Sequence, residues 1–126
     1  MDWKDIEFFK PEEFDSPDYP GSGEIHMNLH FIHILDNIRK ELKNPLIIKS
    51  GFRSPSHNTK VGGTPNSAHL TGNAADILCY NSNLRFSLIK AALEHNISRI
   101  EIAKNHIHLD IEATLPQQVL IYSEKP

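Results

Sequence analysis

Five consecutive residues, His106-Ile107-His108-Leu109-Asp110, alternate strictly between polar and apolar side chains. This period of two is typical of a β-strand, in which successive side chains point to opposite faces of a sheet. A strand here would place Ile107 and Leu109 in the core, and both histidines and the aspartate on the other face. The segment therefore predicts a sheet with one buried face and one face that carries two imidazoles and a carboxylate.

The rest of the apolar pattern predicts an α+β fold. Apolar residues at helical spacing predict amphipathic helices over residues 28–44 and 84–93. We expect strands at five short apolar segments: residues 46–48, 74–79, 100–103, 106–112 and 119–122. A tight turn at Lys104-Asn105 would make the third and fourth strands a hairpin, so we expect a largely antiparallel sheet flanked by helices. The first 27 residues are rich in Pro, Gly, Ser and Asp and predict an irregular arm packed on the domain.

The composition favours a small domain without disulfides. The 126 residues suffice for one compact domain, which we expect to span residues 1–126. Cys79 is the only cysteine, which excludes an intramolecular disulfide and a cysteine-rich zinc finger. The formal net charge of −3 gives no basic surface for nucleic acid. Because neither a secretory signal nor a membrane span is visible, we expect a soluble monomer made in the cytoplasm, without nucleic acid or membrane partners.

Candidate metal ligands occur in two segments of this histidine-rich sequence. Eight histidines are present, and histidine is the commonest metal ligand among the side chains. His69 lies in a predicted loop, and Asp76 follows seven residues later at the start of a strand. Gly72 between them permits a sharp turn, so the two side chains can converge. Together with a histidine from the 106–110 segment, they would form a three-ligand set that suits Zn²⁺ with its fourth position open, although Co²⁺ or Ni²⁺ would also fit.

The residues alone leave two interpretations open. A metal held by two neutral imidazoles and one carboxylate keeps a net positive charge, which favours metal-assisted hydrolysis. Alternatively, these groups make structural hydrogen bonds, and Arg53, a cation after the predicted strand over 46–48, forms an ordinary salt bridge. Asp110 is interpreted as a carboxylate that orients an imidazole rather than as a fourth ligand. The other histidines are expected at the surface or at helix ends: His26, His30, His33, His57 and His95.

Three motifs resemble the D-alanyl-D-alanine metallopeptidases. The segment SAHLTGNAAD (67–76) matches the pattern S-x-H-x-x-G-x-A-x-D at every fixed position. HIH (106–108) matches the H-x-H motif, and SGFR (50–53) matches S-G-[FY]-R, of the wider group that also contains lysostaphin and hedgehog domains. The segments 14–23 and 53–63 are similar to those of compact members found in bacteriophages and prophages. The resemblance extends from about Phe8 to Asp110.

This resemblance implies a metal site with a defined set of residues. His69, Asp76 and His108 would bind one Zn²⁺. His106 would lie beside the metal, where it would stabilise an oxyanion or move a proton. The reaction would be attack of metal-activated water on a peptide carbonyl.

Further residues would bind substrate or act as the base. Arg53 would engage the carboxylate of the substrate or its carbonyl oxygen, and Ser67 would donate a hydrogen bond to it. Some relatives place a catalytic Glu or Asp three residues before the last zinc histidine, but here that residue is Asn105, which cannot act as a base. Glu101 resembles the Glu shortly upstream of H-x-H in hedgehog domains and is an alternative base to His106.

The implied substrate is the stem peptide of bacterial peptidoglycan. The resemblance predicts a zinc peptidase of the cell wall, either a D-Ala-D-Ala carboxypeptidase or an endolysin-like endopeptidase. Without a signal peptide, such a protein would need another route to the wall. Because hedgehog domains keep a zinc site without established peptidase activity, the alternative is a non-catalytic zinc-binding module that recognises cell wall or serves as a virion component.

Overall fold

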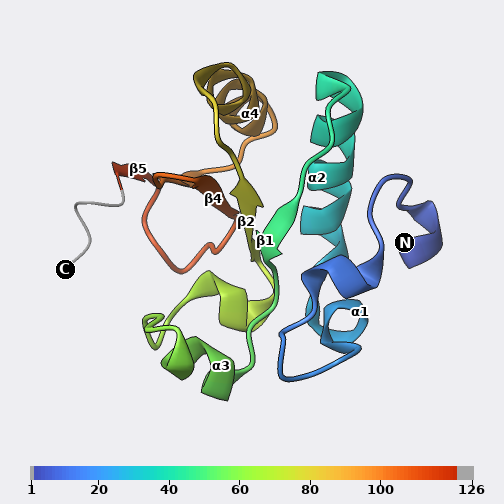
Figure 1. The fold of residues 1–126 in the computed structure, drawn as a ribbon, viewed down its shortest axis with the longest axis vertical. Helices are drawn as coiled ribbons and strands as arrows, with labels where there is room; N and C mark the ends of the chain where they lie inside the picture. Colours follow the sequence, from blue (N-terminus) through green and yellow to red (C-terminus); the bar gives the residue numbers. More distant parts are fainter. Residues whose placement is uncertain (1, 122–126) are drawn as a thin grey trace.

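The computed structural model describes residues 2–121 and is built around a five-stranded sheet of order β1-β2-β4-β3-β5 (Figure 1). The strands are β1 (Ile48–Ser50), β2 (Ala74–Leu78), β3 (Arg99–Ile102), β4 (His106–Asp110) and β5 (Gln118–Ile121). The helices are α1 (Ser22–His26), α2 (Leu29–Leu42), α3 (Pro55–Lys60) and α4 (Ser82–Glu94), with 3₁₀ turns η1 (Trp3–Asp5), η2 (Pro11–Phe14) and η3 (Ala68–Thr71). The pair β3–β5 is parallel and the other pairs are antiparallel, which confirms the predicted α+β class with a largely antiparallel sheet.

The apolar face of the sheet shares a core with α2 and α4. Ile107 and Leu109 of β4 are fully buried together with Ile77 of β2. The helices contribute buried side chains to the same cluster: Phe31, Ile32, Leu35, Ile38, Leu88, Ala91 and Ala92. Each fully buried large apolar side chain stabilises the fold by about 1.5 to 3 kcal/mol. A shift of β4 by one residue would move Ile107 and Leu109 to the opposite face of the sheet. The alternation therefore fixes the face on which the histidines of β4 lie.

The strand β1 differs from its prediction. It spans Ile48–Ser50 rather than 46–48, and its pairing with β2 is irregular between Ile48 and Ser50. Leu46 is buried, whereas Ile47 is largely exposed. The apolar segment 46–48 therefore marks residues that are partly buried before the strand begins. The residues that pair with β2 are Ile48 and Ser50. At the predicted hairpin between β3 and β4, Ala103 donates its backbone N–H to the carbonyl of His106, as the expected Lys104-Asn105 turn requires.

The two long helices follow the predicted pattern and are capped by asparagines. The side chain of Asn28 accepts a hydrogen bond from the backbone N–H of His30, so α2 begins at Leu29. Asn81 accepts from Leu84 in the same way, which is why α4 begins at Ser82 rather than at residue 84. Across residues 2–121, no helix combines the length and the apolar character needed to cross a membrane.

The N-terminal arm packs against the segment that follows β1. The arm contains two 3₁₀ turns and the short helix α1, which its turn-rich composition does not reveal. Phe14 is fully buried, and its carbonyl accepts a hydrogen bond from the backbone of Phe52. The contact with Gly51 is close enough that a Cβ there would lie 2.7 Å from Cα of Phe14. The arm is therefore anchored at the residue pair that precedes Arg53.

Gly72 makes the turn that connects η3 to β2. Its φ of +74° lies in the left-handed region, and a Cβ at this position would lie 2.0 Å from the carbonyl oxygen of His26. Gly72→Ala should therefore lower the free energy of unfolding by about 2 to 4 kcal/mol, because backbone strain and a backbone clash add together. Denaturant titration of both proteins measures the loss.

Gly62 provides the matched control for this substitution. Its φ is +76°, but a Cβ there would meet no atom within 4 Å. Gly62→Ala should therefore cost only the conformational strain, about 1 to 2 kcal/mol. Equal losses in the two variants would contradict the assignment of Gly72 as a close-packed turn.

Candidate metal centre

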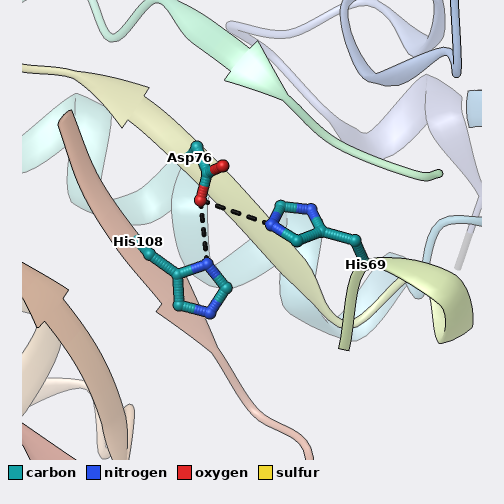
Figure 2. Close-up of side chains that lie close together, drawn as sticks. All are labelled: His69, Asp76 and His108. Atoms are coloured by element: carbon teal, nitrogen blue, oxygen red, sulfur yellow. Dashed lines mark hydrogen bonds and ion pairs between the residues drawn. The ribbon is translucent and has the colours of Figure 1, made fainter. Parts of the chain in front are cut away.

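Three side chains from three separate elements converge above the polar face of the sheet (Figure 2). His69 lies on η3, Asp76 on β2 and His108 on β4. Oδ1 of Asp76 is 3.3 Å from Nε2 of His69 and 2.8 Å from Nδ1 of His108. One nitrogen or oxygen atom from each residue lies within 4.8 Å of the others. The structure thus brings together the three residues selected as ligands from the sequence.

Local structure explains why these side chains meet. Asp76 and His108 are direct partners in the antiparallel register of β2 and β4, so their side chains share one face of the sheet. His69 is held on η3 because Oγ of Ser67 accepts a hydrogen bond from its backbone N–H. Gly72 then turns the chain into β2. The ten-residue motif is therefore a capped turn followed by a strand.

Each imidazole of the cluster is held by its outer nitrogen. Nδ1 of His69 is 2.7 Å from the carbonyl oxygen of Gly51, which can only accept a hydrogen bond. Nδ1 therefore carries a proton, and Nε2 is the nitrogen that faces Asp76. On the other side, Nε2 of His108 is 2.7 Å from Oδ2 of Asp110, so Nδ1 faces Asp76. Histidines that bind metals are held in this way, and the contact places Asp110 where the expected orienting carboxylate would lie.

The electrostatics of the cluster keep its carboxylate ionised. Burial would raise the pKa of Asp76, but hydrogen bonds from His108 and His69 outweigh burial and keep the pKa well below its usual value. Burial would lower the pKa of His108, but hydrogen bonds to Asp110 and Asp76 raise it to about 9. Asp76 is therefore ionised at neutral pH, as a metal ligand must be. Two imidazole nitrogens and one carboxylate oxygen form a donor set that fits Zn²⁺.

Arg53 borders the cluster and is tethered through all three guanidinium nitrogens. Nη2 lies 3.4 Å from Oδ2 of Asp76, Nη1 lies 3.3 Å from Oδ1 of Asn58, and Nε lies 3.2 Å from Oγ of Ser50. The cation predicted to bind substrate is thus in place beside the ligands. It also forms the ion pair that the alternative interpretation expected.

His106 lies on the same face of β4 as His108, two residues away. Its Nδ1 is 3.4 Å from Nζ of Lys49, and because an ammonium can only donate, we assign the ring proton to Nε2. Burial lowers the pKa of His106; the carboxylate of Asp76 opposes this, and the ammonium of Lys49 lowers the pKa further. His106 is therefore a neutral imidazole that can donate from Nε2.

Two further predicted residues lie close to the ligands. Glu101 pairs with His108 in the register of β3 and β4, so it lies on the same face of the sheet, and it is 6% exposed. Ser67 lies at the start of η3, where its hydroxyl oxygen accepts from His69. This acceptor role leaves the hydroxyl proton for another partner.

Comparison with known proteins identifies the family of the chain. A family model described as Peptidase M15 matches residues 9–110. The chain belongs to the M15 peptidase family. M15 peptidases are zinc enzymes, and the matched region contains the whole His–Asp–His cluster. The resemblance inferred from the motifs is thereby confirmed at the level of the family, and membership supports a zinc-dependent metallopeptidase. No curated protein matches the chain at a significant level.

Several residues that support the M15 cluster do not stand out in the sequence. The contact from Gly51 is made by a backbone carbonyl, which no side-chain pattern can reveal. Asn58 lies on the short helix α3, and Lys49 lies on the irregular edge strand β1. The placement of both elements depends on tertiary packing. Arg99 is different, because its spacing of two from Glu101 and the hairpin register place it opposite Asp110.

Proposed function

We propose that this M15 family member is a zinc-dependent peptidase that hydrolyses peptide bonds in the stem peptides of bacterial peptidoglycan. It would act as a D-Ala-D-Ala carboxypeptidase or an endolysin-like endopeptidase, as a monomer. The observation that carries this proposal is the convergence of His69, Asp76 and His108 with the outer nitrogen of each imidazole already held. Purely structural hydrogen bonding does not require both histidines to present a nitrogen to one carboxylate oxygen.

The proposed ligands are Nε2 of His69, Nδ1 of His108 and Oδ1 of Asp76, the atoms that face one another. A Zn²⁺ bound there would supply Lewis acidity, which polarises a carbonyl and lowers the pKa of water. The protein contributes the fixed geometry, since η3, β2 and β4 each hold one ligand.

The remaining polar residues act on the substrate. His106, with its proton on Nε2, donates a hydrogen bond to the carbonyl oxygen as that oxygen becomes negative. Arg53 places a cation beside Asp76, where it attracts a substrate carboxylate or carbonyl oxygen. Glu101, on the neighbouring strand, is the alternative to His106 as the base, and Ser67 donates to the peptide backbone.

The choice of peptidoglycan is supported by the motif itself. The segment 67–76 carries every fixed position of the D-alanyl-D-alanine metallopeptidase pattern, and segments 14–23 and 53–63 are similar to compact phage members. Stem peptides combine D-amino acids with free carboxylates, and the cation of Arg53 suits such an anionic substrate.

Metal removal tests this proposal directly. Incubation with EDTA should abolish the release of amino groups from purified peptidoglycan, and one equivalent of Zn²⁺ should restore it, because the ligand cluster offers one site. Mass spectrometry of products from defined muropeptides then identifies the bond that is cleaved. One equivalent of bound zinc without cleavage of any muropeptide would contradict the peptidase and support a non-catalytic zinc-binding module. Activity that survives complete metal removal would contradict a metal-dependent reaction.

A further inference from the structure

A buried ion pair lies behind the metal centre, on the side of His108 that faces away from Asp76. Nε of Arg99 donates to Oδ1 of Asp110 over 2.9 Å, and Oδ2 of the same carboxylate contacts Nε2 of His108 over 2.7 Å. The side chain of Asp110 is 1% exposed and that of Arg99 is 13% exposed. Neither residue supplies an atom to the cluster of candidate ligands.

Both residues of this pair have further partners. The backbone N–H of Glu112 donates to Oδ1 of Asp110, so the carboxylate is fixed through one oxygen and orients the histidine through the other. Arg99 also donates from Nη1 to the carbonyl of Pro116, in the segment that leads to β5. Its guanidinium thus joins β3, β4 and this segment at the position directly opposite Asp110 in the register.

We propose that Arg99 is a positioning residue for the metal centre. It holds the Asp110 carboxylate in the orientation that fixes the ring of His108, so that Nδ1 of His108 points toward Asp76. This inference rests on the proposed function in one respect, that His108 is a metal ligand. Arg99 would lie three contacts from the metal and would act on it through Asp110 and His108.

The physical reason is that a buried carboxylate needs both charge compensation and a fixed direction. Without the guanidinium, Asp110 keeps the backbone donor of Glu112 and the imidazole of His108, but loses the cation that compensates its charge. The carboxylate is then free to rotate, and the ring of His108 loses the restraint on its outer nitrogen. Loss of such an outer contact lowers metal affinity by about 10- to 100-fold in other sites.

The test measures metal binding rather than catalysis. We expect Arg99→Gln to bind Zn²⁺ about 10- to 100-fold more weakly in chelator competition, and to change the visible absorption of bound Co²⁺, which reports ligand geometry. Asp110→Asn should show a comparable loss, and the double variant should lose no more than Asp110→Asn alone, because Arg99 acts through Asp110. Arg99→Lys should recover part of the affinity, because lysine keeps the charge but not the forked contacts.

Arg39→Gln is the matched control. Arg39 also donates a guanidinium hydrogen bond to a backbone carbonyl, that of Phe8, but it has no contact with the cluster. The Arg39→Gln variant should therefore bind Zn²⁺ like the wild type. If Arg99→Gln does not fold, Arg99→Lys replaces it in the comparison of single and double variants, with the same measurements.

The outcomes separate this inference from the proposed function. Wild-type affinity and an unchanged Co²⁺ spectrum in the Arg99 variant would overturn the inference and leave the proposed function intact. Additive losses in the double variant would also overturn it, since Arg99 would then act by another route. Failure of the wild type to bind any metal would overturn the proposed function itself, and the inference with it.

Discussion

Replacement of His108 by alanine should abolish stoichiometric zinc binding and reduce peptidase activity to background. The substitution removes one of three candidate ligands and also leaves Asp110, which is 1% exposed, without its imidazole partner. The loss of affinity should therefore exceed the roughly 10- to 100-fold that follows from a change in an outer contact. Metal content after dialysis, together with activity on purified peptidoglycan, measures both effects.

Thermal unfolding gives an independent readout of the same substitution. A metal that binds only the folded state stabilises it by mass action, so added Zn²⁺ should raise the Tm of the wild type and not that of His108→Ala. His95→Ala is the control, because His95 pairs with Glu41 away from the cluster and should keep its zinc. One equivalent of zinc retained by His108→Ala would show that the candidate ligands are wrong.

His106→Ala should retain zinc but lose about 10²- to 10³-fold in kcat. His106 supplies no atom to the ligand cluster, yet it lies on the same strand face and carries its proton on Nε2. The loss of one hydrogen bond donor to a developing oxyanion costs this much in other enzymes. Steady-state kinetics on a defined muropeptide, with metal content measured in parallel, checks the prediction.

Two further variants separate hydrogen-bond donation from proton transfer. His106→Gln keeps an N–H donor but cannot titrate, so near-normal turnover would indicate donation, whereas a loss as large as that of alanine would indicate proton transfer. Glu101→Gln removes the other candidate base, which lies opposite His108 in the register. Normal turnover by His106→Ala would contradict a catalytic role for His106 and make Glu101 the better candidate.

The candidate ligands could be named from the sequence through the motif resemblance, and local rules place the histidines of β4 on one face of the sheet. The alternation in β4 determines its buried face, and the turn at Lys104-Asn105 pairs β4 with β3. The contacts around Arg53 could not be predicted, because they depend on where α3, which carries Asn58, lies relative to Arg53. Lys49 lies on an edge strand with an irregular register, and a shift of one residue there changes the face to which its side chain points.

The starts of α2 and α4 also differ in how well the sequence predicts them. Asn28 is the first residue of the predicted helix over 28–44, where a cap belongs, whereas Asn81 precedes the predicted helix over 84–93 by three residues. A cap is fixed by a side-chain hydrogen bond to the backbone, so the apolar stripe alone underestimates the length of α4.

The anchored N-terminal arm has a consequence for the extent of the catalytic unit. Phe14 packs on Gly51, and the carbonyl of Gly51 is the group that holds the outer nitrogen of His69. A residue 55 positions before the first candidate ligand is thus two contacts away from it in space. The folded unit around the candidate metal site therefore extends into the N-terminal arm at least as far as Phe14.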